Sequence, residues 1–324
     1  MHDLQFLLQK QCIESERILL SGPSSPDGDS IGACLALQAL LLQLGCQQVD
    51  VAGKLSFRYN WLPNSSCCLS DDELTAPYSM VIILDGDHHR LTQAVKSAFK
   101  KSKVTAIIDH HQSTKPEDYT LALIDPNASS TCTLIFELAH AWDCQIDQAI
   151  ATNLYAGLVF DTGAFRYQNT TAETLKMAES LMMMGIDHSM ISAKILSERR
   201  PEGVQLFAHV LQNIQYLRNK SVTVGLIQLD RLRHFNCIEE DIEGIVEQLL
   251  FITGVEVAAL CIEQSEQTFK VSLRSRTVVD VAALAHSISQ SGGGHIRAAG
   301  ATVHLPIHTG IEMIKEKLLA AFSH

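Results

Sequence analysis

The first half of the chain alternates short apolar runs with longer segments of helical periodicity. Apolar runs, several rich in β-branched residues, predict buried strands at 17–20, 49–53, 80–84, 104–108 and 122–125. The segment 31–45 has apolar residues at helical spacing and predicts a helix that ends at Gly45. Helical patterns then dominate from about 130 to 215, most clearly at 130–142 and 171–185. This alternation predicts an α/β fold with an N-terminal doubly wound, mainly parallel sheet.

The second half has a different pattern. Strands are expected at 221–229, 255–264 and 268–275, and a helix is expected at 239–254. These elements predict a smaller C-terminal α+β domain with its own core. We therefore expect an N-terminal domain at 1–190, a connecting helix at 191–215 and a second domain at 216–324.

Composition narrows the class of partner. The chain has 324 residues, 46% of them hydrophobic and 19% charged, which is a globular composition with room for two cores. The formal net charge of −11 is unfavourable for long duplex DNA, whose binding needs many Lys and Arg contacts to phosphate. A polyanionic substrate is therefore expected to be short and to be held by local charges or metal ions.

Cysteine usage and the N-terminal segment indicate the compartment. The nine cysteines include no CxxC pair, and "MHDLQFLLQKQ" does not resemble a signal peptide, so a reduced cytoplasmic setting is expected. The longest apolar stretch is interrupted by Gln and is too short to span a bilayer, so no membrane association is expected.

Acidic and His-containing clusters follow the predicted strands or adjoin helix ends. They contain Asp27, Asp29, Asp85, Asp109, His110, His111 and Asp161. Taken singly, each cluster also fits a turn, a helix cap or a surface His pair. Because the carboxyl ends of parallel strands share one crevice, the clusters are expected to converge there. Together, carboxylates and imidazoles suit two divalent ions roughly 3.5–4 Å apart, an arrangement used to transfer phosphoryl groups to water.

A glycine-rich segment near the C-terminus, "SGGGHIRAAGAT", is a second candidate binding element. Its consecutive glycines expose backbone N–H groups that can hold a phosphate, and His295 and Arg297 add donors. The strand segment "SLRSR" adds Arg274 and Arg276. The alternative interpretation is a flexible turn with surface arginines.

These motifs, in this order and over essentially the whole chain, resemble the DHH–DHHA1 phosphoesterases. The carrying segments are "PDGDSIG", the strand-terminal Asp85, "IDHH", "GLVFDTGAFRY" and "GGGHIRAAG". The resemblance is strongest to the two-domain nanoRNase and pAp-phosphatase branch rather than to the larger RecJ exonucleases. It implies Mn²⁺-dependent release of 5′-mononucleotides from linear dinucleotides such as pGpG or pApA, with two ions expected. Some members also dephosphorylate pAp.

The resemblance also implies roles for individual residues. The matched metal ligands are Asp27, Asp29, Asp85, His110 and Asp161, with Asp85 as the bridge between the ions. His111 matches a residue that contacts the scissile phosphate, and Asp109 beside it joins the catalytic set. The substrate-binding set of the second domain is Arg274, Gly293, Gly294, His295 and Arg297.

Two departures from the family pattern affect one metal position. Pro23 occupies the place of a usual His ligand, and the loop after Asp85 is one residue shorter than the common form. One hypothesis is that His88 or His89 supplies the missing imidazole. The other is that one metal site is weaker, completed by water or empty.

Several functions remain open at this point. The leading hypothesis is a cytoplasmic oligoribonuclease acting on short RNA or dinucleotides, such as pGpG from cyclic di-GMP turnover. Alternatives are a pAp 3′-phosphatase, a cyclic dinucleotide phosphodiesterase and a non-catalytic nucleotide-binding protein with an impaired metal site. A homodimer contact through the Met-rich segment "LMMMG" is considered, but core packing of these methionines is favoured.

Overall fold

The computed structural model describes residues 2–53, 55–75, 77–276 and 279–322, and the chain divides into two compact units, Met1–Glu198 and Arg199–His324. The first unit is built on a six-stranded, all-parallel sheet of order β3-β2-β1-β4-β5-β6. Its strands are β1 (Ile18–Ser21), β2 (Val49–Ala52), β3 (Cys68–Leu69), β4 (Met80–Leu84), β5 (Val104–Asp109) and β6 (Leu121–Ile124). The expected α/β fold with a doubly wound parallel sheet is confirmed.

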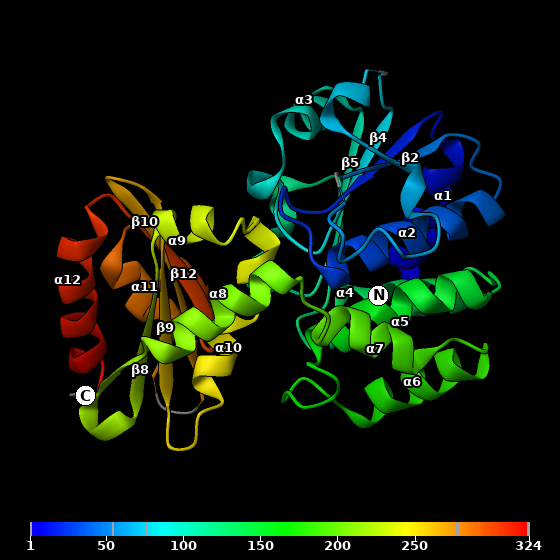
Figure 1. Ribbon diagram of the computed structural model, residues 1–324. Helices are drawn as coiled ribbons and strands as arrows, with labels where there is room; N and C mark the ends of the chain where they lie inside the picture. The colour runs from blue at the N-terminus through cyan, green and yellow to red at the C-terminus, as the bar shows by residue number, and fades with distance from the viewer. Residues whose placement is uncertain (1, 54, 76, 277–278, 323–324) are drawn as a thin grey trace. The chain divides into compact units, whose positions relative to one another are not determined.

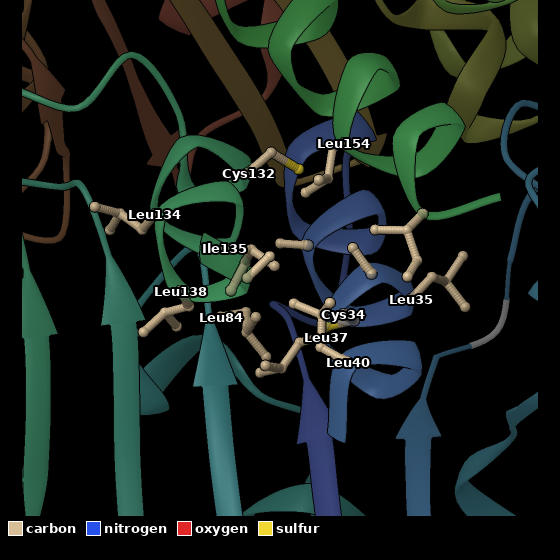
Figure 2. Close-up of a cluster of buried hydrophobic side chains, with 14 of the residues drawn as sticks. Cys34, Leu35, Leu37, Leu40, Leu84, Cys132, Leu134, Ile135, Leu138 and Leu154 are labelled. Carbon is tan, nitrogen blue, oxygen red and sulfur yellow. The ribbon is translucent and has the colours of Figure 1, made fainter. Parts of the chain in front are cut away.

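Helices cover both faces of this sheet (Figure 1). They are α1 (His2–Glu14), α2 (Gly28–Gln43), α3 (Gln93–Lys101), α4 (Thr131–Ala141), α5 (Gln148–Asp161), α6 (Ala172–Met183) and α7 (His188–Leu196). Alternate residues of β4 face opposite cores: Ile82 packs in the core that contains α2, α4 and α5, whereas Ile83 packs with Val95 of α3. Figure 2 shows Leu84 at the end of β4 among side chains of α2 and α4.

The second unit is a mixed sheet of order β11-β12-β10-β9-β8-β7, in which only the β8–β9 pair is parallel among the pairings described. The strands are β7 (Gln215–Leu217), β8 (Val222–Ile227), β9 (Val257–Ser265), β10 (Thr268–Ser275), β11 (Gly293–His295) and β12 (Ala298–Val303). The helices are α8 (Pro201–Gln212), α9 (Leu229–His234), α10 (Ile245–Leu250), α11 (Val281–Ile288) and α12 (Ile307–Ala320). Residues of α11 and α12 pack on one face, and residues of α8 and α10 pack on the other. The expected smaller α+β domain is confirmed.

Two detailed expectations are wrong. The helix expected over 239–254 is divided into a short 3₁₀ turn, Glu239–Ile242, and α10, because Gly244 between them has φ +75° and cannot continue a right-handed helix. The three methionines at the end of α6 do not pack in the core: Met182, Met183 and Met184 are exposed, Met183 by 79%. Leu181 is the residue of that segment that is buried. The homodimer contact stays a prediction.

The segment 191–215, expected as one connecting helix, contains parts of two helices that belong to different units. α7 ends at Leu196, α8 begins at Pro201, and the units divide between Glu198 and Arg199. The domain boundaries expected at 190 and 216 stay a prediction. Over the described ranges, no helix combines the length and the apolar character needed to cross a membrane.

Candidate metal centre

Two helices approach closely at the candidate centre because glycines face each other's backbone. A Cβ on Gly32 of α2 would lie 2.5 Å from the carbonyl oxygen of Asn153 on α5. A Cβ on Gly157 of α5 would lie 2.7 Å from Oδ1 of Asp29 and would also collide with Sγ of Cys132. Only glycine allows this separation. The start of α2, which carries Asp29, is therefore held close to the C-terminal half of α5, which ends at Asp161.

Asp29 is fully buried and is bound by the first turn of α4. Its Oδ2 accepts a 2.6 Å hydrogen bond from the backbone N–H of Thr131, and its Oδ1 accepts a 2.9 Å bond from that of Cys132. The amides of a helix N-terminus stabilise a carboxylate there. Burial nevertheless raises the pKa of Asp29, since the charge of Asp27 adds to it and the charge of His110 offsets it only in part.

Asp27 is the N-cap of α2. Its side chain accepts 3.0 Å hydrogen bonds from the backbone N–H groups of Asp29 and Ser30, and Ser30 Oγ accepts one from the Asp27 N–H, which completes a capping box. Burial, followed by the charge of Asp85 and a hydrogen bond to its carboxyl group, raises the pKa of Asp27 to about 7. Two carboxyl groups in such contact require a shared proton or a cation.

Asp85 follows β4 in a left-handed conformation with φ +60°, which is uncommon for a residue other than Gly. It is 4% exposed, and its Oδ1 accepts a hydrogen bond of 3.2 Å from the hydroxyl of Thr131. Neither Thr131 nor its hydroxyl was singled out from the sequence. The sequence feature that could have indicated this position is the run of Ser129, Ser130 and Thr131 before an apolar helix, because such a run is typical of an N-cap.

His110 links the carboxylates. Its Nε2 lies 3.5 Å from Oδ1 of Asp85 and 3.2 Å from Oδ2 of Asp161, and its Nδ1 lies 3.3 Å from the carbonyl oxygen of Ala128. Burial favours the neutral ring. The hydrogen bond to Asp85 and the charges of Asp161 and Asp29 outweigh burial and raise the pKa of His110 to about 10.

Asp161 is the last residue of α5. Burial, together with the charge of Asp29, raises its pKa well above the usual range for an aspartate, although the charge of His110 opposes this shift. A carboxyl group so placed gains a proton or a cation more readily than one in water.

Asp109 and His111 form a separate pair at the end of β5. Asp109 is fully buried. Its Oδ1 lies 2.6 Å from Nδ1 of His111, and its Oδ2 accepts a hydrogen bond from the hydroxyl of Thr114. Burial works against ionisation of Asp109, but the hydrogen bond and charge of His111 outweigh it and lower the pKa of this carboxyl. In return, the pKa of His111 is raised, since the bond to Asp109 outweighs burial of the ring.

The donor atoms fall into two groups that share one residue. Asp85, His110 and His111 place one donor each within 4.8 Å of one another, and so do Asp29, His110 and Asp161. Carboxylates with imidazole suit divalent ions such as Mn²⁺, Fe²⁺ or Zn²⁺. The raised pKa values of the buried carboxyl groups show that negative charge is unfavourable there, and a bound cation would neutralise that charge. The donors present therefore fit a pair of divalent cations.

His88 and His89 belong to a third group of the described donors, with Asp87. Neither ring is a member of the two groups around His110. Pro23 does lie beside the loop after Asp85, since a Cβ on Gly86 would be 3.0 Å from Pro23 Cγ. The hypothesis that one of these rings replaces an imidazole at position 23 stays a prediction.

In the second unit, strand register brings Arg274 and His295 to the same face. Both are paired with Ala298 of β12, Arg274 from β10 and His295 from β11. Directly opposed residues point to one side of a sheet, so the two side chains flank the small Ala298, about 10 Å apart at two strand spacings. Arg274 Nε donates to Oε1 of Glu247 at 2.8 Å.

The other residues expected to bind substrate adjoin this face. Gly293 and Gly294 lie on the exposed β11, and Gly294 has φ +142° and backs onto the carbonyl oxygen of Ala298. Arg297 is exposed, and its Nη1 lies 3.4 Å from Ser275 Oγ. Arg276 instead donates to the carbonyl oxygen of Leu250.

The first unit gathers carboxylates and imidazoles at the carboxyl edge of a parallel sheet, and the second unit presents Arg and His. This combination is typical of a metal-dependent phosphoesterase. Comparison with known proteins agrees. The model of the DHH family N-terminal domain matches residues 17–158, and that of the DHHA1 domain matches residues 219–323. The chain belongs to the DHH family of phosphoesterases and carries a DHHA1 domain.

Individual relatives span most of the chain. The bifunctional oligoribonuclease and PAP phosphatase NrnA of Thermus thermophilus is 30% identical over 279 residues, which cover 86% of this chain and 81% of that protein. The protein of the same name from Bacillus subtilis is 31% identical over 300 residues, 89% of this chain and 90% of that protein. An exopolyphosphatase-related protein from Bacteroides fragilis shares the fold, with a TM-score of 0.89 at 23% identity over 99% of this chain and 96% of that chain.

Proposed function

We propose that this chain is a phosphodiesterase that hydrolyses short linear oligonucleotides, especially dinucleotides such as pGpG or pApA, to 5′-mononucleotides. The observation that carries the proposal is the position of His110, whose Nε2 lies 3.5 Å from Asp85 and 3.2 Å from Asp161. The imidazole and the carboxyl groups around it form two overlapping sets of donor atoms, which is what a centre for two adjacent divalent cations needs. The relatives named as oligoribonucleases, which match most of the chain, support the substrate class.

In this proposal, the residues that would hold two divalent ions, Mn²⁺ being the metal proposed, are Asp27, Asp29, Asp85, His110 and Asp161, and Asp85 is the residue that would serve both. The bound ions supply Lewis acidity and neutralise charge on the phosphoryl oxygens during transfer to water. Hard carboxylate oxygens with one imidazole are a donor set suited to Mn²⁺. The amides of Thr131 and Cys132 and the hydroxyl of Thr131 fix two of these carboxylates before any metal binds.

The Asp109–His111 pair has a different task. Since the bond to Asp109 raises the pKa of His111, its imidazolium form is favoured and presents an N–H donor. We assign to that donor the stabilisation of a phosphoryl oxygen of the substrate, with Asp109 holding the ring in place. Asp109 remains ionised because its pKa is lowered.

The second unit is proposed to bind the part of the substrate beyond the scissile phosphate. Arg274 and His295 on one face, with the backbone N–H groups of Gly293 and Gly294 and the exposed Arg297, suit a phosphate group.

We further propose that residues 1–190 form the catalytic domain, 191–215 the connection and 216–324 the substrate-binding domain. The net charge of −11 argues for short RNA rather than long duplex DNA. All nine cysteines are free, which supports a cytoplasmic setting.

Product analysis on defined RNAs of two to six nucleotides with Mn²⁺ tests the proposal. We expect dinucleotides to be cleaved fastest and to yield 5′-mononucleotides. An Asp85→Asn variant provides the inactive control. Equal rates on all lengths, or turnover of none, would contradict the assignment.

A second candidate is 3′-dephosphorylation of pAp, which is favoured by the names of the Thermus and Bacillus relatives as PAP phosphatases. The same centre would serve, because pAp presents a terminal phosphate instead of a bridging one. Release of inorganic phosphate from pAp, measured beside cleavage of pApA, separates the two activities. Nucleotide binding without turnover of either substrate would instead identify a non-catalytic protein.

A further inference from the structure

A third cluster of metal-ligating side chains lies in the turn after β4. Asp87 is the N-cap of a short 3₁₀ turn, His88–Arg90, and its Oδ1 accepts a 2.6 Å hydrogen bond from the backbone N–H of His89. The same Oδ1 lies 3.8 Å from Nδ1 of His88 and 4.0 Å from Nε2 of His89. The three residues each offer a donor atom within 4.8 Å of the others.

His88 is held in place by neighbouring aromatic side chains. Its ring stacks on Phe99 of α3, with centroids 5.3 Å apart and planes inclined by 1°, and meets the edge of Tyr119 at 5.6 Å. The Tyr119 hydroxyl accepts a 3.0 Å hydrogen bond from the His88 backbone N–H and lies 3.3 Å from Nδ1 of the ring. Packing therefore fixes one imidazole of the cluster before a ligand binds.

We propose that Asp87, His88 and His89 form a separate binding site for a late first-row divalent cation such as Zn²⁺. Two imidazoles and one carboxylate are the donor set that Zn²⁺, Ni²⁺ and Cu²⁺ prefer, whereas the centre around Asp85 is rich in hard carboxylates. Metal–nitrogen distances of about 2.0–2.1 Å in a tetrahedral site place donors roughly 3.3 Å apart. Oδ1 of Asp87 lies 3.8 Å from the His88 ring and 4.0 Å from the His89 ring. Small rotations of the Asp87 and His89 side chains bring these distances to that value, and the His89 side chain is 74% exposed.

A cation at this site would restrain the segments around it. The turn is joined to the segment before α2 by a 2.8 Å hydrogen bond from the Ser24 backbone N–H to the carbonyl oxygen of Arg90. A cation held at 87–89 therefore fixes the segment that directly follows Asp85. Cation binding at this site does not depend on the substrate of the enzyme.

Zinc stoichiometry of the full-length, untagged protein tests the proposal. The background carries His110→Ala and Asp161→Asn, which leave neither donor group of the main centre complete, and Cys67→Ser, which removes the exposed cysteine. Equilibrium dialysis with Zn²⁺, read by elemental analysis, is expected to give one tightly bound equivalent. Adding His88→Ala and His89→Ala is expected to remove it, whereas His188→Ala, an exposed His beside an Asp at the N-cap of α7, is expected to retain it.

Three results would overturn the proposal. They are a background that binds no zinc, a His88→Ala/His89→Ala variant that keeps its equivalent, and loss of Mn²⁺ from an otherwise intact protein carrying that double substitution. The last result would assign the two rings to the main centre instead. Should the double variant fail to fold, as judged by circular dichroism, His89→Ala alone serves. Its zinc affinity is expected to fall by more than roughly tenfold, since loss of an outer-shell partner already costs that much.

Discussion

The backbone N–H of Thr131 donates a 2.6 Å hydrogen bond to Oδ2 of Asp29, a residue 102 positions earlier in the chain. Through this bond the first turn of α4 binds the first turn of α2 at the carboxyl edge of the sheet. The hydroxyl of the same threonine donates to Asp85 at 3.2 Å. Thr131 thus positions two candidate metal ligands from different elements, and the centre depends on the packing of α2, α4 and α5 (Figure 2).

Gly157→Ala is expected to weaken metal binding and to destabilise the fold. The added Cβ would lie 2.7 Å from Asp29 Oδ1 and would collide with Cys132, so α5 must move away from α2. Overpacking of this kind costs about 1–3 kcal/mol of unfolding free energy. Thermal unfolding with and without Mn²⁺ measures both effects. Gly293→Ala is the matched control, because its Cβ would meet nothing within 4 Å, and equal behaviour of the two variants would contradict the packing argument.

Asp161→Asn is expected to stabilise the metal-free protein while abolishing tight Mn²⁺ binding. Burial and the charge of Asp29 raise the pKa of Asp161, so the ionised carboxylate is unfavourable until a cation binds. Asn keeps a polar group beside His110 Nε2, which lies 3.2 Å from Oδ2 of Asp161, and removes the penalty of a buried charge, so the Tm of the metal-free protein is expected to rise. The control is Asp187→Asn at the N-cap of α7, where Asn caps as well as Asp. A lower Tm for metal-free Asp161→Asn would show that the carboxylate is not repelled there.

Asp109→Asn is expected to lower kcat by roughly 10²–10⁴-fold with little change in KM. The carboxylate of Asp109 lies 2.6 Å from His111 and raises the pKa of the ring. The amide of Asn neither raises that pKa nor orients the ring as well. The alkaline decline of the pH–rate profile should shift to lower pH in the variant, because the pKa of His111 is no longer raised by Asp109. A parallel rise in KM with unchanged kcat would place Asp109 in substrate binding instead.

The longer, apolar strands were well predicted, whereas β3, β7, β11 and β12 were not expected. β4 (Met80–Leu84) and β10 (Thr268–Ser275) match the expected ranges residue for residue, because each is a short run of strand-type pattern with clear limits. α2 begins at Gly28, three residues before the expected start, because Asp27 caps it and the apolar pattern begins only after the polar first turn. The break at Gly244 was missed because a single Gly inside a helical pattern is often tolerated.

The proximity of several candidate ligands could be expected from the sequence, whereas the contacts that support them could not; the roles of these residues stay a prediction. Asp85 and Asp109 follow strands, so their convergence at one sheet edge could be expected from topology. The contacts made by Thr131 and Thr114 depend on how α4 and the loop after β5 pack, which periodicity does not reveal. The grouping of His88 and His89 with Asp87 depended on side-chain geometry in the same way.

Glu247→Gln is expected to raise KM for dinucleotides by about three- to tenfold and to leave kcat unchanged. Glu247 accepts a 2.8 Å charge-assisted hydrogen bond from Arg274 Nε and thereby orients the guanidinium group. The free energy that a partly exposed pair of this kind contributes corresponds to about a three- to tenfold change in KM. Glu312→Gln is the matched control, because Glu312 pairs with Lys315 on the surface of α12. A fall in kcat with unchanged KM would mean that Glu247 does not act through substrate binding.

The metal-free protein is expected to lose stability as pH rises from 6 to 9. In the folded chain the pKa of Asp27 is raised from 3.8 to about 7, and that of His110 is raised from 6.5 to about 10. Both groups therefore bind more protons when folded than when unfolded, so the free energy of unfolding decreases as pH rises. The Asp27 contribution changes between about 4 and 7, and the His110 contribution changes between about 6.5 and 10.

Divalent cations are expected to reverse this trend, because ligation requires the unprotonated imidazole and carboxylates. The gain in Tm on adding Mn²⁺ to EDTA-treated protein should therefore increase across the same pH range. His110→Gln removes the group responsible above pH 7 and should flatten both curves there. Differential scanning calorimetry at each pH measures the two quantities together. A metal-free Tm that rises with pH would show that the candidate centre is not a cluster of proton-binding groups, and the metal site built on His110 would have to be abandoned.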